Sequence, residues 1–366
     1  MNPIRYEDLN PDYGPNFDAD LDAVIAEVER AVRDSVDGEG EGRAVRFAHA
    51  KAYGLLEGEL EILDVGDDPR YAQGIFATPG RHRALIRYSN GLGHLGPDAK
   101  LGAACGMAIK IFGIEGPSMS DEPDAGTMDY NLINYPVFFA NTARDYITVA
   151  WLFNELPDGL TDRTQRAAWL HAFLTRDGAL PPEEWLWDEL FAISGLFTVP
   201  MPNLLHAAYW SMGAVRHGEY VAKVRMLPTT QHPGGIPSTV DPTASPEAVR
   251  DALIADSGTA HTFDLQVQLC VNLEAMPVEN TSIPWPERLS PFVTVARLTL
   301  PAQDVSAPEN PLRADALSFT PWRAPAEHQP LGQIQTVRRR VYEHSSILRH
   351  KINGQPRREP TAPGEI

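Results

Sequence analysis

The sequence predicts an α+β fold, built on an antiparallel β-barrel of about eight strands with helical additions. Three observations predict it. Short β-like runs recur along most of the chain, a helical stretch interrupts them, and an amphipathic helical pattern stands near each end. The chain has 366 residues, which exceeds the usual length of one domain, but barrels of this size can form around a single core.

The first element is an amphipathic helix over residues 20 to 36. Apolar residues recur there at helical spacing, with acidic residues between them: Leu21, Val24, Ile25, Val28, Val32 and Val36. The turn GEGEG at 38–42 ends this helix.

The strands follow as eight short runs rich in β-branched, aromatic and alternating residues. Five come first: RAVRFAHA, LLEGELEIL, HRALIRYS, GMAIKIFG and YNLINYPVFF. Three come later: EYVAKVRML, FDLQVQLCV and FVTVARLTL. Residues 142–195 read as helical, 227–262 as a long connection with one short helix near PEAVRDALIA, and 333–352 as a final helix. We therefore expect an N-terminal helical arm (1–42) and a barrel (43–366) that carries a helical insertion and a C-terminal helix.

Charge and composition exclude several classes of function. A net charge of -18 would repel nucleic acid, and no run of eighteen apolar residues predicts an integral membrane segment. The N-terminus lacks a targeting pattern, so the expected location is the cytoplasm. Cys105 and Cys270 lack the spacing of a zinc or iron–sulfur site, and nucleotide-binding, zinc-protease and serine-hydrolase motifs are absent from the sequence.

Two residues stand out as chemical candidates. His49 lies in RFAHAKAYG, a strand-like run, where it would share a face with Phe47 and Lys51; a core histidine is the alternative interpretation. Tyr342 follows Arg338 by four residues and precedes Arg349 by seven, so on one helix the three project within about 60° of one face.

A tyrosine can bind ferric iron only as a phenolate. Because the solution pKa of tyrosine is about 10, a neighbouring cation is needed at neutral pH, and Arg338 is one helical turn away. The alternative interpretation of Tyr342 is a tyrosine shielded by long arginine stems.

Five separated blocks carry a resemblance to a known family. They are 46–54 (RFAHAKAYG), 84–90 (ALIRYSN), 105–113 (CGMAIKIFG), 131–146 (NLINYPVFFANTARDY), and 316–322 (ALSFTPW) with Arg338, Tyr342 and Arg349 after it. In these blocks the chain resembles the haem catalases and their smaller catalase-related relatives, which include allene oxide synthases. The resemblance implies a catalase-like barrel with haem b as cofactor.

The resemblance also implies catalytic roles. His49 would move a proton between the two peroxide oxygens, and Ser89 would hydrogen-bond His49. Asn134 would orient the peroxide, but this position departs from the family pattern. Large catalases place the asparagine three residues before Pro136, where this chain has Ile133, whereas Asn134 lies only two before.

The cofactor-binding residues follow from the same blocks. Tyr342 would be the ligand of the haem iron, held as phenolate by Arg338. The resemblance assigns the propionates to Arg46, Arg87 and Arg349, and the haem face and its surroundings to Phe138, Phe139 and Tyr146.

Three departures from large catalases shape the substrate prediction. Only about twenty-four residues follow Tyr342, so the C-terminal helical domain of large catalases is expected to be absent. Ala103 replaces an aspartate of the peroxide channel, and Ala48 replaces the valine before the distal histidine. Both changes favour organic or fatty-acid hydroperoxides over hydrogen peroxide.

The sequence thus predicts a haem-dependent, peroxidase-like oxidoreductase of oxidative-stress type that cleaves the O–O bond of peroxides. Hydrogen peroxide dismutation and fatty-acid hydroperoxide rearrangement are the enzymatic alternatives. A non-catalytic haem-binding or haem-storage protein, or a barrel without haem, are the others. A homo-oligomer is expected, with a dimer preferred because large catalases form tetramers partly through segments that this chain shortens or lacks.

Overall fold

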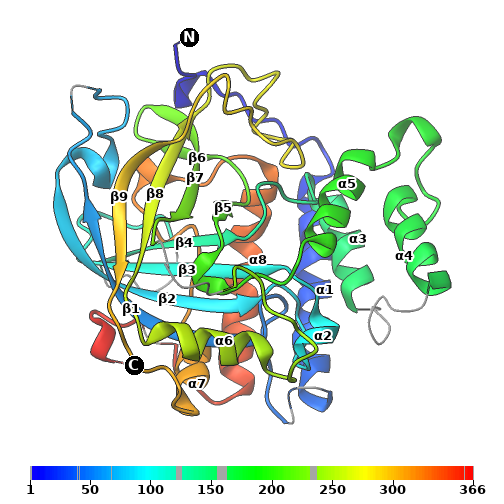
Figure 1. The fold of residues 1–366 in the computed structure, drawn as a ribbon. Coiled ribbons are helices and arrows are strands. Elements are labelled where there is room, and N and C mark those ends of the chain that lie inside the picture. Colours follow the sequence, from blue (N-terminus) through cyan, green and yellow to red (C-terminus); the bar gives the residue numbers. More distant parts are fainter. Residues whose placement is uncertain are drawn as a thin grey trace.

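The computed structural model describes residues 2–38, 40, 42–66, 68–120, 126–154, 163–230, 237–357 and 359–365. Nine strands form its single sheet (Figure 1). They are β1 (Ala52–Ile62), β2 (Gly80–Asn90), β3 (Cys105–Phe112), β4 (Thr127–Ile133), β5 (Tyr209–Ser211), β6 (Val215–His217), β7 (Tyr220–Pro228), β8 (His261–Leu269) and β9 (Val293–Leu300).

Eight of these strands close into a barrel. The order is β5-β4-β3-β2-β1-β9-β8-β7, every neighbour pair is antiparallel, and β5 also pairs with β7. The ninth strand, β6, is a short extension beside β7. The predicted fold class, an eight-stranded antiparallel barrel with helices, is confirmed.

Strand periodicity separates the barrel interior from its outer face. On β3 the interior side chains Met107, Ile109 and Ile111 join the main apolar core, whereas Gly106 and Ala108 point outward. The outer face of β3, β4 and the second half of β2 is itself covered by other segments, and the residues there are therefore mostly buried on both faces. The two small outward residues leave room outside this part of the wall.

The part of the chain that the structure describes contains eight α-helices outside the barrel. They are α1 (Phe17–Asp37), α2 (Asp98–Leu101), α3 (Ala143–Asn154), α4 (Arg163–Thr175), α5 (Trp187–Thr198), α6 (Ala248–Ser257), α7 (Glu309–Ala316) and α8 (Gln333–Ile352). Helix α8 contacts both α1 and α3, and Figure 1 shows α3, α4 and α5 on the side of the molecule away from the barrel. The bounds of α8 coincide with the predicted 333–352.

The structure corrects several predicted elements. The run RAVRFAHA is not a strand, since residues 43–50 form bends and irregular backbone. YNLINYPVFF leaves the sheet after Ile133, because β4 ends there. The short strands β5 and β6 and the helices α2 and α7 were not predicted. Parts of the GEGEG turn (39 and 41) and of the helical insertion (155–162) lie outside the described residues.

A buried ionic cluster ties the C-terminal segment to the outer face of the barrel. The ammonium of Lys110 on β3 donates a 2.8 Å hydrogen bond to Asp129 on β4 and pairs with Glu359. Arg323 pairs with both of these carboxylates, at 3.2 Å from Glu359. All four side chains are almost fully buried, so the charges must satisfy one another.

Candidate functional site

A cavity lies between the outer face of β2–β4 and helix α8. It offers about 170 Å³ to the centres of water-sized molecules. A single water needs only about 10–15 Å³ on this measure, so the cavity has room for an organic group. Its walls come from residues 46–49, 131–133 and 317–319, from Arg87, Ser89 and residues 91–93, and from residues of β3, α3, α5 and α8.

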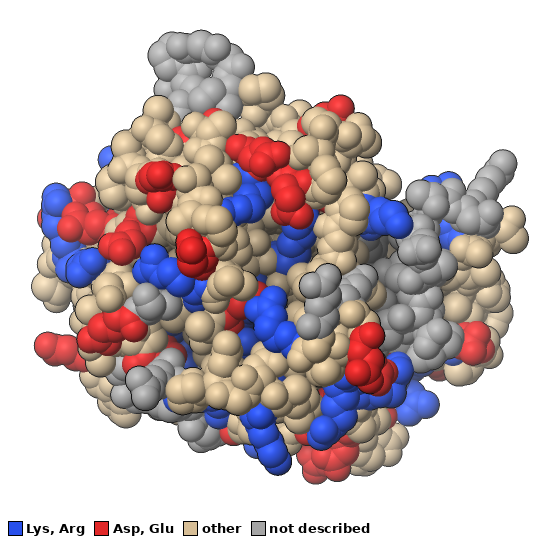
Figure 2. Space-filling view, turned by 90° about the horizontal axis from the view of Figure 1, so that it is seen from below, with Lys and Arg blue, Asp and Glu red and all other residues tan. Residues whose placement is uncertain are grey.

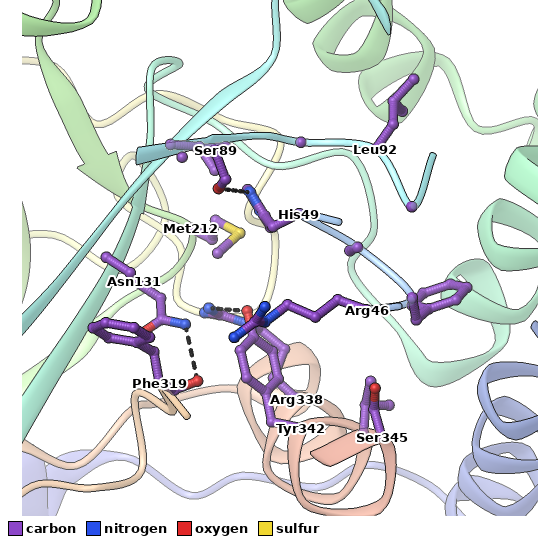
Figure 3. Close-up of a pocket in the computed structure, with 18 of the residues that line it drawn as sticks. Arg46, His49, Ser89, Leu92, Asn131, Met212, Phe319, Arg338, Tyr342 and Ser345 are labelled. Atoms are coloured by element: carbon purple, nitrogen blue, oxygen red, sulfur yellow. Dashed lines mark hydrogen bonds between the residues drawn. The ribbon is translucent and has the colours of Figure 1, made fainter. Parts of the chain in front are cut away.

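Figure 3 shows the two chemical candidates on opposite sides of this cavity. His49 projects from one wall, with Met212 beside it, and Tyr342 projects from α8 on the other. Arg46 also lines the cavity, and its guanidinium is bonded to Asp315 and to the carbonyl oxygen of Leu317.

The backbone at His49 explains why the segment before it lines the cavity. His49 has φ of 59°, in the left-handed region that costs energy for a residue with a side chain. Its amide donates a 3.2 Å hydrogen bond to Gly91. The left-handed turn breaks the strand alternation that the sequence predicted, and four consecutive residues reach the cavity instead of two: Arg46, Phe47, Ala48 and His49.

The imidazole of His49 is held by Ser89. Its Nδ1 lies 3.0 Å from the Ser89 hydroxyl, as the sequence comparison implied. The ring rests on the backbone of Gly106, where an added Cβ would lie 2.6 Å from Nδ1. Burial, and then the positive charges of Arg87, Arg338 and Arg46, lower the pKa of His49 to about 3. The imidazole is therefore neutral at neutral pH, and in the tautomer that donates Nδ1–H to Ser89 its Nε2 can accept a proton.

On the opposite wall a chain of hydrogen bonds orients Tyr342. Arg338 donates a 3.1 Å hydrogen bond to the Tyr342 hydroxyl oxygen and a 2.5 Å bond to the Gln335 side chain. The backbone carbonyl of Gln335 accepts a 2.7 Å hydrogen bond from the indole nitrogen of Trp322, which ties this turn of α8 to the segment before it. The Tyr342 hydroxyl is thereby held in place at the cavity wall.

Three further arginines converge at one edge of the cavity. Arg46, Arg87 and Arg349 line it and also contact Asp315, the first two through its carboxylate and Arg349 through its carbonyl. Arg87 is buried, and its Nε has no hydrogen-bond partner in the described part of the chain. A buried guanidinium with an unsatisfied donor fits an acidic group that binds from the cavity side.

Aromatic side chains form another part of the cavity wall. The rings of Phe138 and Phe139 lie 4.3 Å apart between centroids, and Tyr146 stacks against Phe138 at 6.5 Å. Phe47 meets Tyr146 edge to face. Burial raises the pKa of Tyr146, which keeps this second cavity tyrosine a neutral phenol.

The structure does not bring Asn134 to the cavity. Its amide nitrogen donates to the carbonyl of Ala103 at 2.9 Å, and its oxygen accepts from the amide of Cys105 at 2.8 Å. Both ends of the side chain thus serve the backbone at the start of β3, and neither faces a ligand. Ile133 and Asn131, on the outward face of β4, line the cavity instead.

Sequence reasoning missed other lining residues. Leu92, Val149, Leu196 and Met212 make the wall near His49 more apolar, and Asn131 adds one amide. The alternation along β4 could have identified Asn131, since it shares a face with Ile133. The other four come from loops and from helices α3 and α5, and nothing in their sequence spacing indicates a common site. Of the two departures noted above, Ala48 lines the cavity, whereas Ala103 is buried away from it.

On the face drawn in Figure 2, acidic and basic groups are interspersed, and the basic groups form no continuous patch there. In the ranges that the structure describes, no helix is both long and apolar enough to cross a membrane.

Comparison with known structures identifies the architecture. The chain superimposes on a fungal catalase with a TM-score of 0.60 and 18% identity, covering 96% of this chain and 66% of that one. Catalase A from Saccharomyces cerevisiae gives 0.57 and 16%, with 96% and 70% covered. A bacterial catalase gives 0.60 and 16%, with 89% and 61% covered. The chain has a catalase-like fold.

This catalase-like chain spans between 61% and 70% of the length of those three proteins. Searches of protein-family models and of curated proteins gave no match. The structural likeness, at such low identity, establishes the fold, so the function has to be argued from the cavity.

The cavity residues of the catalase-like barrel fit a haem group in three respects. A phenol held by a guanidinium faces the cavity from α8, which suits an iron ligand. The unsatisfied Nε of Arg87, at an edge with three arginines, suits the haem propionates. Between them the walls are mainly apolar, as the faces of a macrocycle require.

Proposed function

We propose that this protein is a haem-dependent oxidoreductase that cleaves the O–O bond of peroxides, with organic or fatty-acid hydroperoxides as preferred substrates. One observation carries the proposal: a neutral histidine, fixed by Ser89, faces an arginine-held tyrosine across a single apolar cavity. The catalase-like fold supports it, since the solved structures that match are catalases.

In this proposal Tyr342 holds the iron as phenolate, and Arg338 keeps the negative charge on the phenol oxygen. Arg46, Arg87 and Arg349 bind the propionates of haem b, and Phe138 and Phe139 border its face. Haem, when bound, supplies the redox chemistry that breaks the O–O bond.

The chain's own part in the reaction is proton transfer. Nε2 of His49 accepts the proton from one peroxide oxygen and returns it to the other, which leaves as water or an alcohol. Because the pKa of His49 is lowered to about 3, the imidazole is a free base before each turnover. Ser89 and the backbone of Gly106 keep the ring in place while the proton is transferred.

The shape and polarity of the wall near His49 support a larger substrate. Ala48, Leu92 and Met212 are apolar or small, and Asn134 is turned away, so this wall offers few polar groups to a small hydrophilic peroxide. An alkyl chain removed from water gains roughly 0.8 kcal/mol for each buried methylene, which favours hydroperoxides with long apolar tails.

A spectrum and a pair of substrates test the proposal. Haem-supplemented protein should show a Soret band, and it should consume a fatty-acid hydroperoxide faster than hydrogen peroxide. His49→Ala should keep the Soret band and lose about 100-fold or more in rate, because general acid–base catalysis contributes about 10²–10⁴. His82→Ala, a histidine of β2 outside the cavity, serves as the control and should match the wild type. Normal turnover by His49→Ala would contradict the role of the histidine.

One alternative function has a specific observation in its favour. Asn134 lies outside the cavity, so the amide that would orient the peroxide is missing from the position where the family pattern places it. This favours a haem-binding or storage protein. Such a protein would show the Soret band without peroxide consumption. Oxygen release from hydrogen peroxide would indicate dismutation, and loss of lipid hydroperoxide with neither oxygen release nor oxidation of a reducing co-substrate would indicate rearrangement.

A further inference from the structure

Asp315, in the last turn of α7, is the counter-ion of the arginines at the edge of the cavity. Its Oδ1 accepts a 2.7 Å hydrogen bond from Arg46 and a 3.2 Å bond from Arg87. Its Oδ2 lies 3.6 Å from a guanidinium nitrogen of Arg43. One carboxylate therefore faces three guanidinium groups, two from residues 43–46 and one from β2.

The two closest arginines stand between Asp315 and the cavity. Arg46 and Arg87 line the cavity, whereas Asp315 does not, and its side chain keeps 17% of its surface exposed. The carboxylate thus lies behind the guanidinium groups, on the side away from the space where a haem edge would fit.

Backbone carbonyls hold the arginines in place independently of the Asp315 charge. Arg46 donates to the carbonyl oxygens of Leu317 at 2.6 Å and Ala314 at 3.3 Å. Arg349 donates to the carbonyl of Asp315 at 2.8 Å, and Arg87 donates to that of His49 at 2.8 Å. These four contacts do not depend on the Asp315 carboxylate being ionised.

The negative charge of Asp315 stabilises the charged form of the neighbouring arginines. Burial, and then repulsion from Arg46, lower the pKa of Arg87 to about 9 and that of Arg349 to about 8, and the charge of Asp315 acts in the opposite direction. Within the described ranges, no other carboxylate lies within 4.0 Å of Arg46 or Arg87. Without haem, Asp315 is the carboxylate that offsets part of the positive charge of this cluster.

We propose that Asp315 competes electrostatically with the haem propionates for Arg46 and Arg87, so that it stabilises the haem-free protein and speeds haem release. This inference rests on the proposed function, because it requires haem in the cavity. A propionate bound to the cavity side of the same guanidinium groups lies within several ångströms of the Asp315 carboxylate, and two negative charges at that separation repel each other.

The test is haem release from Asp315→Asn. The asparagine oxygen can accept the same hydrogen bonds, and the backbone contacts remain, so the substitution removes mainly the charge. Transfer of haem to an excess of apomyoglobin should be about ten-fold slower than from the wild type. The haem-free variant should unfold at a lower temperature than the haem-free wild type, because its buried arginines lose their counter-ion.

Three controls isolate the charge. Glu309→Gln removes an exposed carboxylate from the same helix and should release haem at the wild-type rate. Asp315→Glu retains the charge and should also leave release close to the wild-type rate. With haem dimethyl ester, which has no free propionates, Asp315→Asn and the wild type should release the ligand equally fast. If Asp315→Asn does not fold without haem, Asp315→Ser offers a smaller acceptor and the same expected slowing.

The outcomes separate the two proposals. A Soret band in the wild type, with equal or faster haem release from Asp315→Asn and Asp315→Ser, would overturn the role of Asp315 alone. Slower release that persists with the dimethyl ester would overturn it as well, since the propionates would then not be involved. Wild-type protein that never acquires a Soret band would overturn the proposed function and this inference together.

Discussion

Replacing Gly106 by alanine should disable His49 as the proton-transfer residue, although His49 itself is unchanged. Gly106 lies on the outward face of β3, directly under the imidazole of His49. A Cβ at this position would be 2.6 Å from both Cε1 and Nδ1 of His49, and 3.2 Å from the hydroxyl oxygen of Ser89. Gly106 does not have a positive φ, so an alanine there brings the methyl group and no backbone strain.

The size of the effect follows from these distances. Carbon atoms pack at about 3.5–4.0 Å, so the ring has to retreat by about 1 Å. Retreat breaks the 3.0 Å hydrogen bond to Ser89, worth about 0.5–1.5 kcal/mol, and adds an overpacking cost of about 1–3 kcal/mol. Together these terms predict a loss of about 1.5–4.5 kcal/mol in the free energy of unfolding. The rate of peroxide consumption should fall about 100-fold, since the imidazole leaves its place for proton transfer.

The measurement combines turnover with haem content. Peroxide consumption is normalised to the Soret absorbance, so a deficit in haem cannot be mistaken for a deficit in chemistry. Gly96→Ala is the matched control, because an added Cβ there meets nothing within 4 Å and Gly96 has no positive φ. Wild-type turnover by Gly106→Ala would refute the placement of His49 in the reaction.

Three further predictions concern stability and substrate size. Burial lowers the pKa values of His217 to about 4 and His328 to about 3, below the unfolded value of about 6.5, so the unfolded chain binds more protons. The contribution of these two histidines to stability is therefore fully present above about pH 6.5. The free energy of unfolding falls as the pH drops towards 4, by up to about 1.4 kcal/mol per pH unit for each histidine. Urea unfolding between pH 7 and 4.5 should show this slope, and His328→Gln should reduce it. Lys110→Met leaves Asp129 buried without its ammonium partner and should lower the free energy of unfolding by about 3–5 kcal/mol; a loss below about 1 kcal/mol in urea titration would show that the cluster re-pairs without it. Ala48→Val narrows the space beside the histidine and should reduce the rate ratio of fatty-acid hydroperoxide to hydrogen peroxide by about ten-fold, and an unchanged ratio would argue against a steric basis for substrate choice.

The parts of the fold that sequence predicts well are those with long, regular patterns. Helix α8 has its bounds at the predicted residues, because a twenty-residue amphipathic pattern leaves little freedom in its register. Seven of the eight predicted runs contain a strand of the barrel. The remaining strand of the barrel is β5. It has only three residues, which are too few to show an alternation of apolar and polar side chains.

The errors at the site have a local physical cause. The run around His49 alternates like a strand, but its left-handed residue depends on contacts with residues 91–92, which are distant in sequence. Asn134 lies close to the position expected of a catalytic amide. Its side-chain oxygen and nitrogen are instead hydrogen-bonded to the backbone groups of Cys105 and Ala103, which keeps the amide away from a ligand. The pairing of Arg338 with Tyr342 was predictable, because both lie on one regular helix.

The shortest strand of the barrel has a consequence for how the molecule can move. Strand β5 is joined to β4 and to β7 by only two residue pairs each, whereas β1 and β2 share a ladder of ten. A sheet opens most easily where the fewest backbone hydrogen bonds join its strands. Among the strands of the barrel, amide hydrogen exchange should therefore be fastest in β5 and in the residues paired with it. Met212, which lines the cavity beside His49, follows β5 directly. The barrel can therefore open locally at the cavity wall that holds Met212, while α8 keeps Tyr342, Arg338 and Arg349 in place at the other wall.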